Sequence, residues 1–520
     1  MPFLDLDIEA AARLCNLEKY GDWYRDPWGW PECNAEFASS LGPGDLGVVK
    51  DGKRYILGHE PAFHVFDVPK SYIGIRPAVI QDVQSRLAYA AAASALAPKL
   101  HSALPDWVFG WRVRDTALTK TADEWALYRA SQSAISTSEH AAQTDVTSFF
   151  ASVDIEDLVL QIVDIVGDGA PVDIIRRVLR AHNNLTTRRG LPQRSTASSI
   201  LAQVAMRDVD DLLGSALDAG RITNARRWMD DISFEGPEAE LYGLLVLLQE
   251  HGRHTGLEMN ASKTKLLTGS ESSEIFEKDA QRLIQVPIID SGGGDYDDMF
   301  STIFDADELL AAEAEVLANP TGQSRSFAGL VLRSLRHYDA YDRSSEWMAA
   351  AHHLPHAADN VGRYLSAAWR NDIWANLQFE DWFVESEASS WPHLDWVSAQ
   401  HALVIPSSEL TDGSNSILAR WLAESSNLQK VAVAVHRLAL SRPKDARVSI
   451  VSRLDSTSDP LLVRLLSLGY LVAGGSTKVV ADALARHASN TITLKYLVSH
   501  SWQLPVVSPD FDPSADDVGE

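Results

Sequence analysis

The sequence has little cysteine, no long apolar run and no excess of positive charge, and each shortage excludes a class of protein. Cys15 and Cys33 are the only cysteines among 520 residues, so a fold held by disulfides is not indicated. An alanine-rich apolar stretch, residues 87–97, is too short to span a bilayer, and we find no longer one. The acidic N-terminus lacks the basic and apolar regions of a signal peptide. We therefore expect a soluble, cytoplasmic protein with no membrane partner.

The chain carries a formal net charge of −25, which argues against a general nucleic-acid binder. Net charge does not describe local patches, however. Arginines cluster in residues 174–190 and again in residues 221–228. A local surface for nucleic acid therefore stays compatible with an acidic chain.

Length and local patterns predict several domains. We interpret residues 1–55 as an N-terminal extension and residues 56–275 as a mixture of short strands and helices. Residues 276–505 contain helical segments separated by short polar breaks. This rhythm fits either a HEAT-like helical-repeat array or an irregular helical domain. Residues 506–520 form an acidic tail that we expect to be disordered.

Two adjacent aspartates, Asp230 and Asp231, lie between two runs that can pair as a β-hairpin. Asp145 lies at the end of another predicted strand. If these strands are neighbours in one sheet, three carboxylates meet at one edge and form a site for Mg²⁺ and substrate phosphates. Two such ions activate an attacking hydroxyl and stabilise a leaving pyrophosphate, which is polymerase chemistry. A pair of aspartates alone is more often a solvated turn or a helix cap.

The surrounding motifs favour the polymerase interpretation. Four stretches follow one another along the chain: "DVTSFF" (145–150), "GLPQRSTASSILAQ" (190–203), "WMDD" (228–231) and "GLEMNASKTKLL" (256–267). In this order they resemble the palm of the reverse transcriptases, and "PKSYIGIRPAV" (69–79) resembles the fingers element of that family. The resemblance covers roughly residues 60–275 and implies an α+β fold. Its expected parts are right-hand polymerase fingers and a palm with an antiparallel sheet and helices, followed by an all-α C-terminal domain.

The resemblance implies a role for each carboxylate and for the residues around them. Asp145, Asp230 and Asp231 would be catalytic and would bind two Mg²⁺ ions, with Mn²⁺ as an alternative. Asp231 would be the weaker ligand, because adjacent side chains diverge in a turn. The expected nucleotide-binding residues are Lys70, Arg76, Phe149, Phe150, Gln193 and Lys263.

Within this set, Lys70 and Arg76 would grip the triphosphate, and Lys263 would lie near the pyrophosphate leaving group. Phe149 would lie under the sugar and exclude a 2′-hydroxyl, whereas Phe150 would belong to the core behind it. Gln193 would lie near the nascent base pair.

A third group would contact primer, template or other nucleic acid. Its members are Arg194, Ser198, Arg226, Arg227, Trp228 and Met229. Arg226 and Arg227 would either place positive charge near the carboxylates or reach nucleic-acid phosphate. Arg194 replaces the usual glycine of the family, Trp228 the usual tyrosine, and Gln203 the usual asparagine. Arg194 would either clamp a phosphate or obstruct an ordinary template–primer duplex.

Within the family, the "R-aromatic-x-DD" hairpin and the helical second half resemble the bacterial abortive-infection, defence-associated branch. This resemblance implies a DNA polymerase acting in anti-phage defence, by template-independent or protein-primed synthesis from an unidentified priming residue. One alternative is a conventional RNA-templated reverse transcriptase with a partner noncoding RNA. A non-enzymatic alternative is an RNA-binding scaffold or phage sensor. The expected partners are deoxynucleoside triphosphates, nucleic acid and further copies of the chain.

Overall fold

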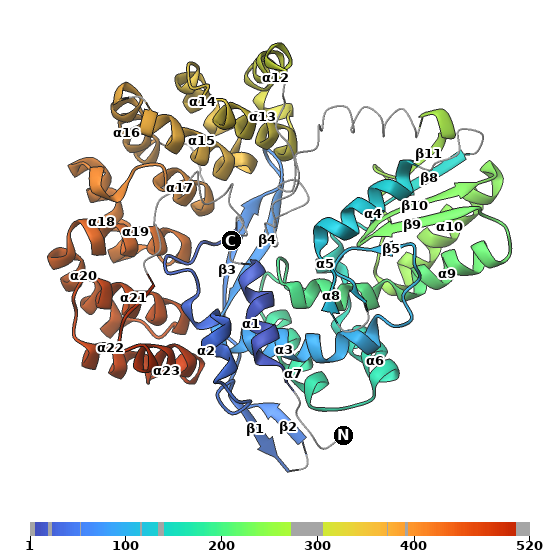
Figure 1. Cartoon of the computed structure of the whole chain (residues 1–520), viewed down its shortest axis with the longest axis horizontal. Helices are drawn as coiled ribbons and strands as arrows, with labels where there is room; N and C mark the ends of the chain where they lie inside the picture. The colour runs from blue at the N-terminus through green and yellow to red at the C-terminus, as the bar shows by residue number, and fades with distance from the viewer. Residues whose placement is uncertain are drawn as a thin grey trace. The chain divides into compact units, whose positions relative to one another are not determined.

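The computed structural model describes residues 6–18, 23–52, 54–114, 117–133, 140–271, 305–371, 373–389 and 394–505 (Figure 1). The chain divides into two compact units, each built from separate segments. The first unit combines Met1–Cys15, Ser39–Pro61 and Ser85–Arg282, and the second combines Asn16–Ala38, Ala62–Gln84 and Leu283–Glu520.

The predicted domain boundaries differ from this division. The predicted N-terminal extension and the predicted fingers segment each contribute residues to the second unit. The predicted acidic tail, residues 506–520, lies outside the described residues.

A five-stranded sheet forms the centre of the first unit, in the order β11-β8-β10-β9-β5. Its strands are β5 (Val108–Phe109), β8 (His140–Thr144), β9 (Asn224–Trp228), β10 (Asp231–Gly236) and β11 (Lys265–Thr268). Neighbouring strands are antiparallel, except that β5 runs parallel to β9. The predicted antiparallel sheet with helices is therefore confirmed in this unit.

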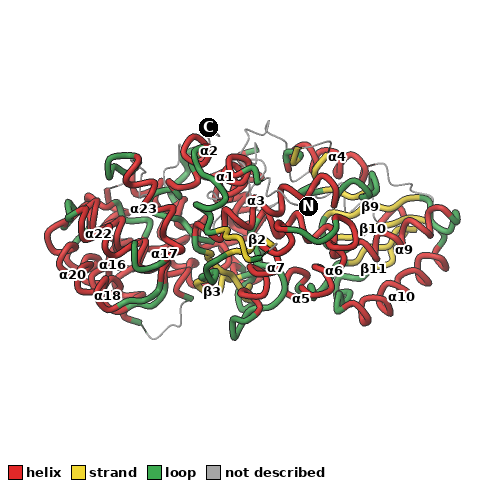
Figure 2. The backbone as a smooth tube through the Cα atoms, turned by 90° about the horizontal axis from the view of Figure 1, so that it is seen from below, coloured by secondary structure: helices red, strands yellow, loops and turns green. Residues whose placement is uncertain are grey.

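Helices cover both faces of this sheet. Helix α9 (Arg207–Asp218) packs against β9, and α10 (Glu238–Thr255) packs against β8, β10 and β11. Helix α4 (Thr121–Ser133) packs against β5 and β9, and Figure 2 shows it on the opposite side of the strands from α10. The two faces follow from strand alternation: Arg227 contacts α9, and the next residue, Trp228, contacts α4.

The remaining elements of this unit lie around the sheet, and several have recognisable end signals. They are α1 (Ile8–Leu17), β1 (Val48–Asp51), β2 (Arg54–Leu57), α3 (Val83–Leu100), β6 (Val113–Arg114), β7 (Ala117–Leu118), α5 (Phe149–Ser152), α6 (Ile155–Val166), α7 (Ala170–Asn183) and α8 (Thr196–Ala205). Asp154 caps α6 by accepting hydrogen bonds from the backbone of Glu156 and Asp157. Gly256 ends α10 in the left-handed conformation that favours glycine.

The second unit is helical in its C-terminal part, where residues 305–371, 373–389 and 394–505 contain no strand. Its α-helices are α12 (Ala306–Ala318), α13 (Arg325–His337), α14 (Ser344–Ala350), α15 (Ala358–Asn371), α16 (Ile373–Ala388), α17 (Asp395–Ala402), α18 (Asp412–Glu424), α19 (Leu428–Ser441), α20 (Pro443–Ser456), α21 (Pro460–Val472), α22 (Thr477–Leu484) and α23 (Thr491–Ser499). Odd-numbered helices from α13 to α21 contact one another in series, and so do even-numbered helices from α14 to α20.

Two N-terminal segments complete this unit. Strands β3 (Phe63–Pro69) and β4 (Ile75–Gln81) form an antiparallel hairpin, with β3 against α17. The second segment is residues 23–38, which contain most of α2 (Ala35–Ser39). Its Asp26 and Glu32 side chains accept hydrogen bonds from Arg464 of α21. Part of the predicted N-terminal extension is thus a buried component of the helical unit.

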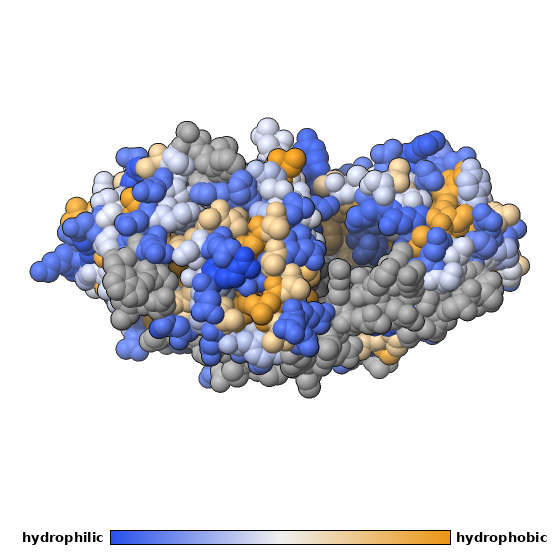
Figure 3. Space-filling model, turned by 90° about the horizontal axis from the view of Figure 1, so that it is seen from above, coloured by the Kyte–Doolittle hydropathy of each residue, from blue (hydrophilic) through white to orange (hydrophobic). Residues whose placement is uncertain are grey.

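Among the described helices, none is both long and apolar enough to cross a membrane. On the face displayed in Figure 3, apolar residues form separate patches among hydrophilic ones.

Candidate active site

The β9–β10 hairpin carries the paired aspartates. Trp228 pairs with Asp231, so Met229 and Asp230 form a two-residue turn and Asp231 begins β10. Met229 has a φ of 51°, in the left-handed region. This conformation costs a residue with a side chain roughly 1–2 kcal/mol, and such strain concentrates at functional sites.

Asp145 follows β8 and lies beside the hairpin. Thr144 pairs with Ile232, which places Asp145 next to Asp231 across the sheet. The Asp145 side chain is buried, and its Oδ2 accepts a hydrogen bond from Lys263 Nζ at 2.5 Å. Its Oδ1 is buried too, and no hydrogen-bond partner reaches it from the described part of the chain.

The segment that carries Lys263 is fixed to the Asp145 loop by its backbone. The Asn260 amide donates to the Asp145 carbonyl, and the Thr147 amide donates to the Glu258 carbonyl, both at 2.8 Å. The structure therefore brings Asp145, Asp230, Asp231 and Lys263 to one edge of the sheet.

The carboxylates of this edge repel one another. Burial, followed by the charges of Asp231 and Asp145, raises the pKa of Asp230 to about 7. Desolvation and the charge of Asp145 also raise the pKa of Asp231, although Lys263 opposes that shift and the residue reaches solvent. Burial lowers the pKa of Lys263, but its hydrogen bond to Asp145 and the three carboxylate charges outweigh burial and raise it. Among the described residues, the half-exposed Lys263 ammonium is the cation that opposes the repulsion of the three carboxylates, and the pKa of Asp230 and of Asp231 stays raised in spite of it.

This imbalance suits a divalent cation. No group of three or more His, Cys, Asp or Glu side chains within the described ranges already converges as a metal-binding cluster. Mg²⁺ in nucleotide-handling sites needs only one or two protein carboxylates, because water and substrate phosphates complete its shell. The buried Asp145 Oδ1 and the raised pKa of Asp230 are features that a hard cation would relieve. The residues present therefore fit Mg²⁺ or Mn²⁺.

The two phenylalanines after Asp145 differ in exposure. Phe149 is 3% exposed and belongs to the core, whereas Phe150 is only half-buried. Their ring centroids are 5.5 Å apart. We expected Phe149 under the sugar and Phe150 in the core, but Phe149 is the buried residue and Phe150 is the more exposed one.

The "GLPQ" loop packs directly against these phenylalanines. The Leu191 amide donates to the Phe150 carbonyl at 2.8 Å. Gly190 has a φ of 67°, and a Cβ there would lie 2.0 Å from the same carbonyl oxygen, so only glycine fits.

Arg194 has a φ of 64°, so an arginine adopts the left-handed conformation for which the family's usual glycine is suited. Gln193 and Arg194 are half-buried. Ser198 has no exposed surface, and its hydroxyl lies 3.1 Å from the Tyr89 hydroxyl. The prediction that Ser198 contacts the primer is therefore wrong for this structure.

The predictions for Trp228 and Met229 are also contradicted, because their side chains are 0% and 4% exposed. The Trp228 ring lies 5.0 Å from Trp125 and 5.5 Å from Tyr128, both on α4. This tryptophan therefore anchors the hairpin in an aromatic cluster and does not stack on a primer terminus.

Arg226 and Arg227 are 1% and 0% exposed, so the prediction that they reach nucleic-acid phosphate is wrong for this structure. Arg226 forms an ion pair with Glu235, and Arg227 forms one with Asp210. Sequence analysis missed Asp210, Glu235 and the role of Gln203. Two arginines within a pattern typical of a buried strand could have indicated these residues, because buried charges need partners of opposite charge.

The other arginine cluster, in residues 174–190, is paired as well. Arg176 forms an ion pair with Asp173, Arg177 with Glu60, and Arg180 with Glu156. The positive charge of this run is therefore partly neutralised within the first unit.

Lys70 and Arg76 belong to the second unit, on the β3–β4 hairpin. The Lys70 amide donates to the Gly74 carbonyl in the hairpin turn, and Arg76 pairs with Val68. They lie outside the unit that carries the three carboxylates, and their contact with a triphosphate stays a prediction.

Comparison with known families is consistent with this site. Residues 68–289 match the family model described as reverse transcriptase (RNA-dependent DNA polymerase). No curated protein matches the chain. The family match indicates a nucleotidyltransferase, an RNA-directed DNA polymerase, whose substrates are nucleotides and nucleic acid.

Proposed function

Starting from the reverse transcriptase domain at residues 68–289, we propose a Mg²⁺-dependent DNA polymerase whose metal ligands are Asp145 and Asp230. Asp231 is the weaker ligand, and Mn²⁺ is the alternative ion. The observation that carries this proposal is that Asp145, Asp230 and Asp231 lie at one edge of the sheet, beside the strained β9–β10 turn, near enough for their charges to raise the pKa of Asp230.

A divalent cation held there supplies activation of the attacking 3′-hydroxyl and stabilisation of charge on the leaving pyrophosphate. Asp145 offers a buried Oδ1 for binding, and Asp230 must lose its proton before it binds. Lys263, which donates to Asp145 Oδ2 in the structure, would donate a proton to the leaving pyrophosphate.

Phe150 is the better candidate for the side chain under the nucleotide sugar, because Phe149 is buried. Bulk at that position excludes a 2′-hydroxyl and selects deoxynucleotides. Gln193 and Arg194, on the loop that packs against Phe150, are then placed to meet the nascent base pair or a phosphate.

We further propose that synthesis is atypical, without a template or primed by the protein, and serves anti-phage defence. Support comes from Arg194, which puts a cationic side chain where the family has glycine. The serial contacts of α13 to α21 support a HEAT-like array in the second unit, which would mediate homo-oligomerisation.

The test is incorporation of labelled deoxynucleotides by the full-length protein with Mg²⁺, with and without a primed RNA template. Asp230→Asn is expected to abolish incorporation, whereas Asp218→Asn, at an exposed position ending α9, is expected to leave it unchanged. Equal incorporation by wild type and Asp230→Asn would sink the polymerase assignment.

Sequencing the product and the co-purified nucleic acid separates the alternatives. Low-complexity DNA made without template supports atypical synthesis. DNA copied from a defined RNA supports the conventional enzyme, and bound RNA without DNA synthesis supports the scaffold.

A further inference from the structure

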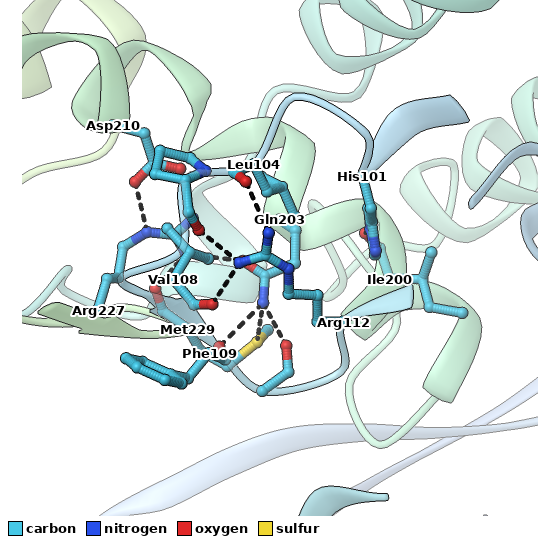
Figure 4. A network of polar contacts seen from close by, with 12 residues as sticks. His101, Leu104, Val108, Phe109, Arg112, Ile200, Gln203, Asp210, Arg227 and Met229 are labelled. Carbon is cyan, nitrogen blue, oxygen red and sulfur yellow. Dashed lines mark hydrogen bonds and ion pairs between the residues drawn. The ribbon is translucent and has the colours of Figure 1, made fainter. Parts of the chain in front are cut away.

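Arg227 lies behind the catalytic turn, with no exposed surface. Its Nε and Nη2 donate to the two carboxylate oxygens of Asp210 on α9, over 2.7 and 2.5 Å. Its Nη1 donates to Gln203 Oε1 at 2.8 Å and to the Met229 carbonyl at 2.7 Å (Figure 4). One side chain therefore ties α8 and α9 to the backbone of the turn that carries Asp230.

Gln203 completes this network from α8, and its side chain is fully buried. Its Nε2 donates to the carbonyls of Phe109 and Gly110, at the end of β5, over 3.2 and 2.5 Å. The same nitrogen lies 3.4 Å from Met229 Sδ. Met229 is thus held at its carbonyl by Arg227, and its sulfur lies against the Gln203 amide.

The restraint acts on a strained residue. A left-handed Met229 persists only if its surroundings over-determine its conformation. Its carbonyl belongs to the peptide plane that leads into Asp230, so fixing that oxygen fixes the direction in which Asp230 leaves the turn.

We infer that Arg227, oriented by Asp210 and Gln203, is a positioning residue that sets the geometry of Asp230 for metal binding. The inference rests on the proposed role of Asp230 as a metal ligand. Residues that orient ligands in this way typically change metal affinity about 10- to 100-fold when they are altered.

The chain offers a matched control one residue away. Arg226 is as buried as Arg227 and hydrogen-bonds the buried carboxylate of Glu235 on β10. Because neighbouring strand residues face opposite sides, this pair lies on the other face of the sheet. Glu235 pairs with Asn224, at the end of the hairpin away from the turn.

Double variants that remove both charges of a buried pair separate an effect on the position of Asp230 from an effect on the stability of the fold. Arg227→Gln alone leaves the buried Asp210 carboxylate without a counter-charge, which destabilises any fold. Arg227→Gln with Asp210→Asn removes both charges, and Arg226→Gln with Glu235→Gln does the same in the control. If the first double variant does not fold, Arg227→Lys replaces it, because lysine keeps the charge but lacks the fork that reaches three partners.

The first readout needs no metal. With ¹³C-methyl methionine, the Met229 resonance is one of only six and is assigned by Met229→Leu. We expect it to shift or split in the Arg227/Asp210 variant and to stay in place in the Arg226/Glu235 control. The second readout is Mn²⁺ affinity measured by electron paramagnetic resonance. We expect it to fall about tenfold or more in the first variant and to be unchanged in the control.

Each result has one meaning. A Met229 resonance and a Mn²⁺ affinity that match the control overturn the inference. A shifted Met229 resonance with weakened Mn²⁺ binding supports it. If wild type binds no Mn²⁺ but the Met229 resonance still shifts, the proposed metal site fails while Arg227 remains the residue that positions the turn.

Discussion

Both units bury carboxylates close together, but they compensate them differently. In the second unit, Asp26 and Glu32 share the buried guanidinium of Arg464, which also lies 4.7 Å from the Trp30 ring. Burial alone would raise the pKa of Glu32, yet Arg464 lowers it. At the candidate active site of the first unit, burial and mutual repulsion instead raise the pKa of Asp230 to about 7.

The difference distinguishes carboxylates that stabilise the fold from carboxylates that are proposed to bind a metal ion. Where carboxylates only stabilise the fold, a rigid cation with several donors satisfies them. Where they are proposed to receive a metal, one half-exposed lysine balances three of them and can be displaced. The under-compensated site keeps electrostatic strain that a bound cation would relieve.

Breaking the compensated site has the largest expected effect. Arg464→Met leaves Asp26 and Glu32 buried without a partner, which should lower the free energy of unfolding by about 3–5 kcal/mol. Thermal or urea unfolding of the full-length protein measures the loss. Arg442→Met is the control, because Arg442 pairs with Asp412 at the surface and should contribute about 0–1 kcal/mol. Equal losses for the two variants would contradict the comparison.

Removing a carboxylate from the candidate active site should instead raise the free energy of unfolding. The pKa of Asp230 in the folded protein, about 7, exceeds its ordinary value of 3.8. The folded state therefore binds more protons than the unfolded state between these values, and stability falls as pH rises through that window. Without metal at pH 8, Asp230→Asn should be more stable than wild type by roughly 1–2 kcal/mol after allowance for solvent screening.

The pH series provides the check on this prediction. The advantage of Asp230→Asn should vanish below about pH 4, where both states of wild type are protonated. Denaturant titrations in a chelating buffer measure it. A variant that is less stable than wild type at pH 8 would show that Asp230 is a compensated, structural carboxylate.

Arg194→Gly tests strain at the second motif. Glycine adopts the left-handed conformation of residue 194 without the cost that a side chain incurs, so stability should rise by about 1 kcal/mol. If Arg194 also obstructs a duplex, extension on a primed RNA template should increase in the variant. Equal extension by variant and wild type would refute obstruction, and a loss of stability would show that arginine contacts outweigh backbone strain.

Lys263→Met should produce the smallest change in free energy, because its side chain is 57% exposed. Removing the competing ammonium should tighten Mn²⁺ binding a few-fold, by about 1 kcal/mol or less, while nucleotide incorporation slows. Lys265→Met, on the exposed start of β11, is the matched control. Weaker Mn²⁺ binding in Lys263→Met would mean that Lys263 organises the carboxylates and does not compete with the cation.

The placement of Asp145, Asp230 and Asp231 at one sheet edge could be predicted because the information for it is local and ordered along the chain. Strand-and-turn patterns around Asp145 and Asp230, followed by the Lys263 motif, were enough to expect one sheet edge. The structure places Lys263 on Asp145 across 118 positions of sequence. The motif order predicted Lys263 near the leaving pyrophosphate, and its contact with Asp145 was not predicted.

The errors arose where a residue's partner lay outside its own motif. Arg227 of strand β9 has its carboxylate partner 17 positions away, on helix α9, so its charge was interpreted as a contact for nucleic acid. Asp26 and Glu32 have theirs more than 400 positions away, which no local pattern reveals. Trp228 was expected at a primer terminus. Its packing on α4 depends on tertiary structure, which its own motif does not reveal.

Proton release on metal binding tests the central claim, that the candidate active site is an under-compensated metal site, most directly. Calorimetric titration of Mn²⁺ at pH 6, in buffers of different ionisation enthalpy, counts the protons released. Wild type should release about one proton per binding event, because Asp230 is protonated there before the ion binds, and Asp230→Asn should release clearly fewer. Mn²⁺ binding by wild type without proton release, or equal release by both proteins, would contradict the account.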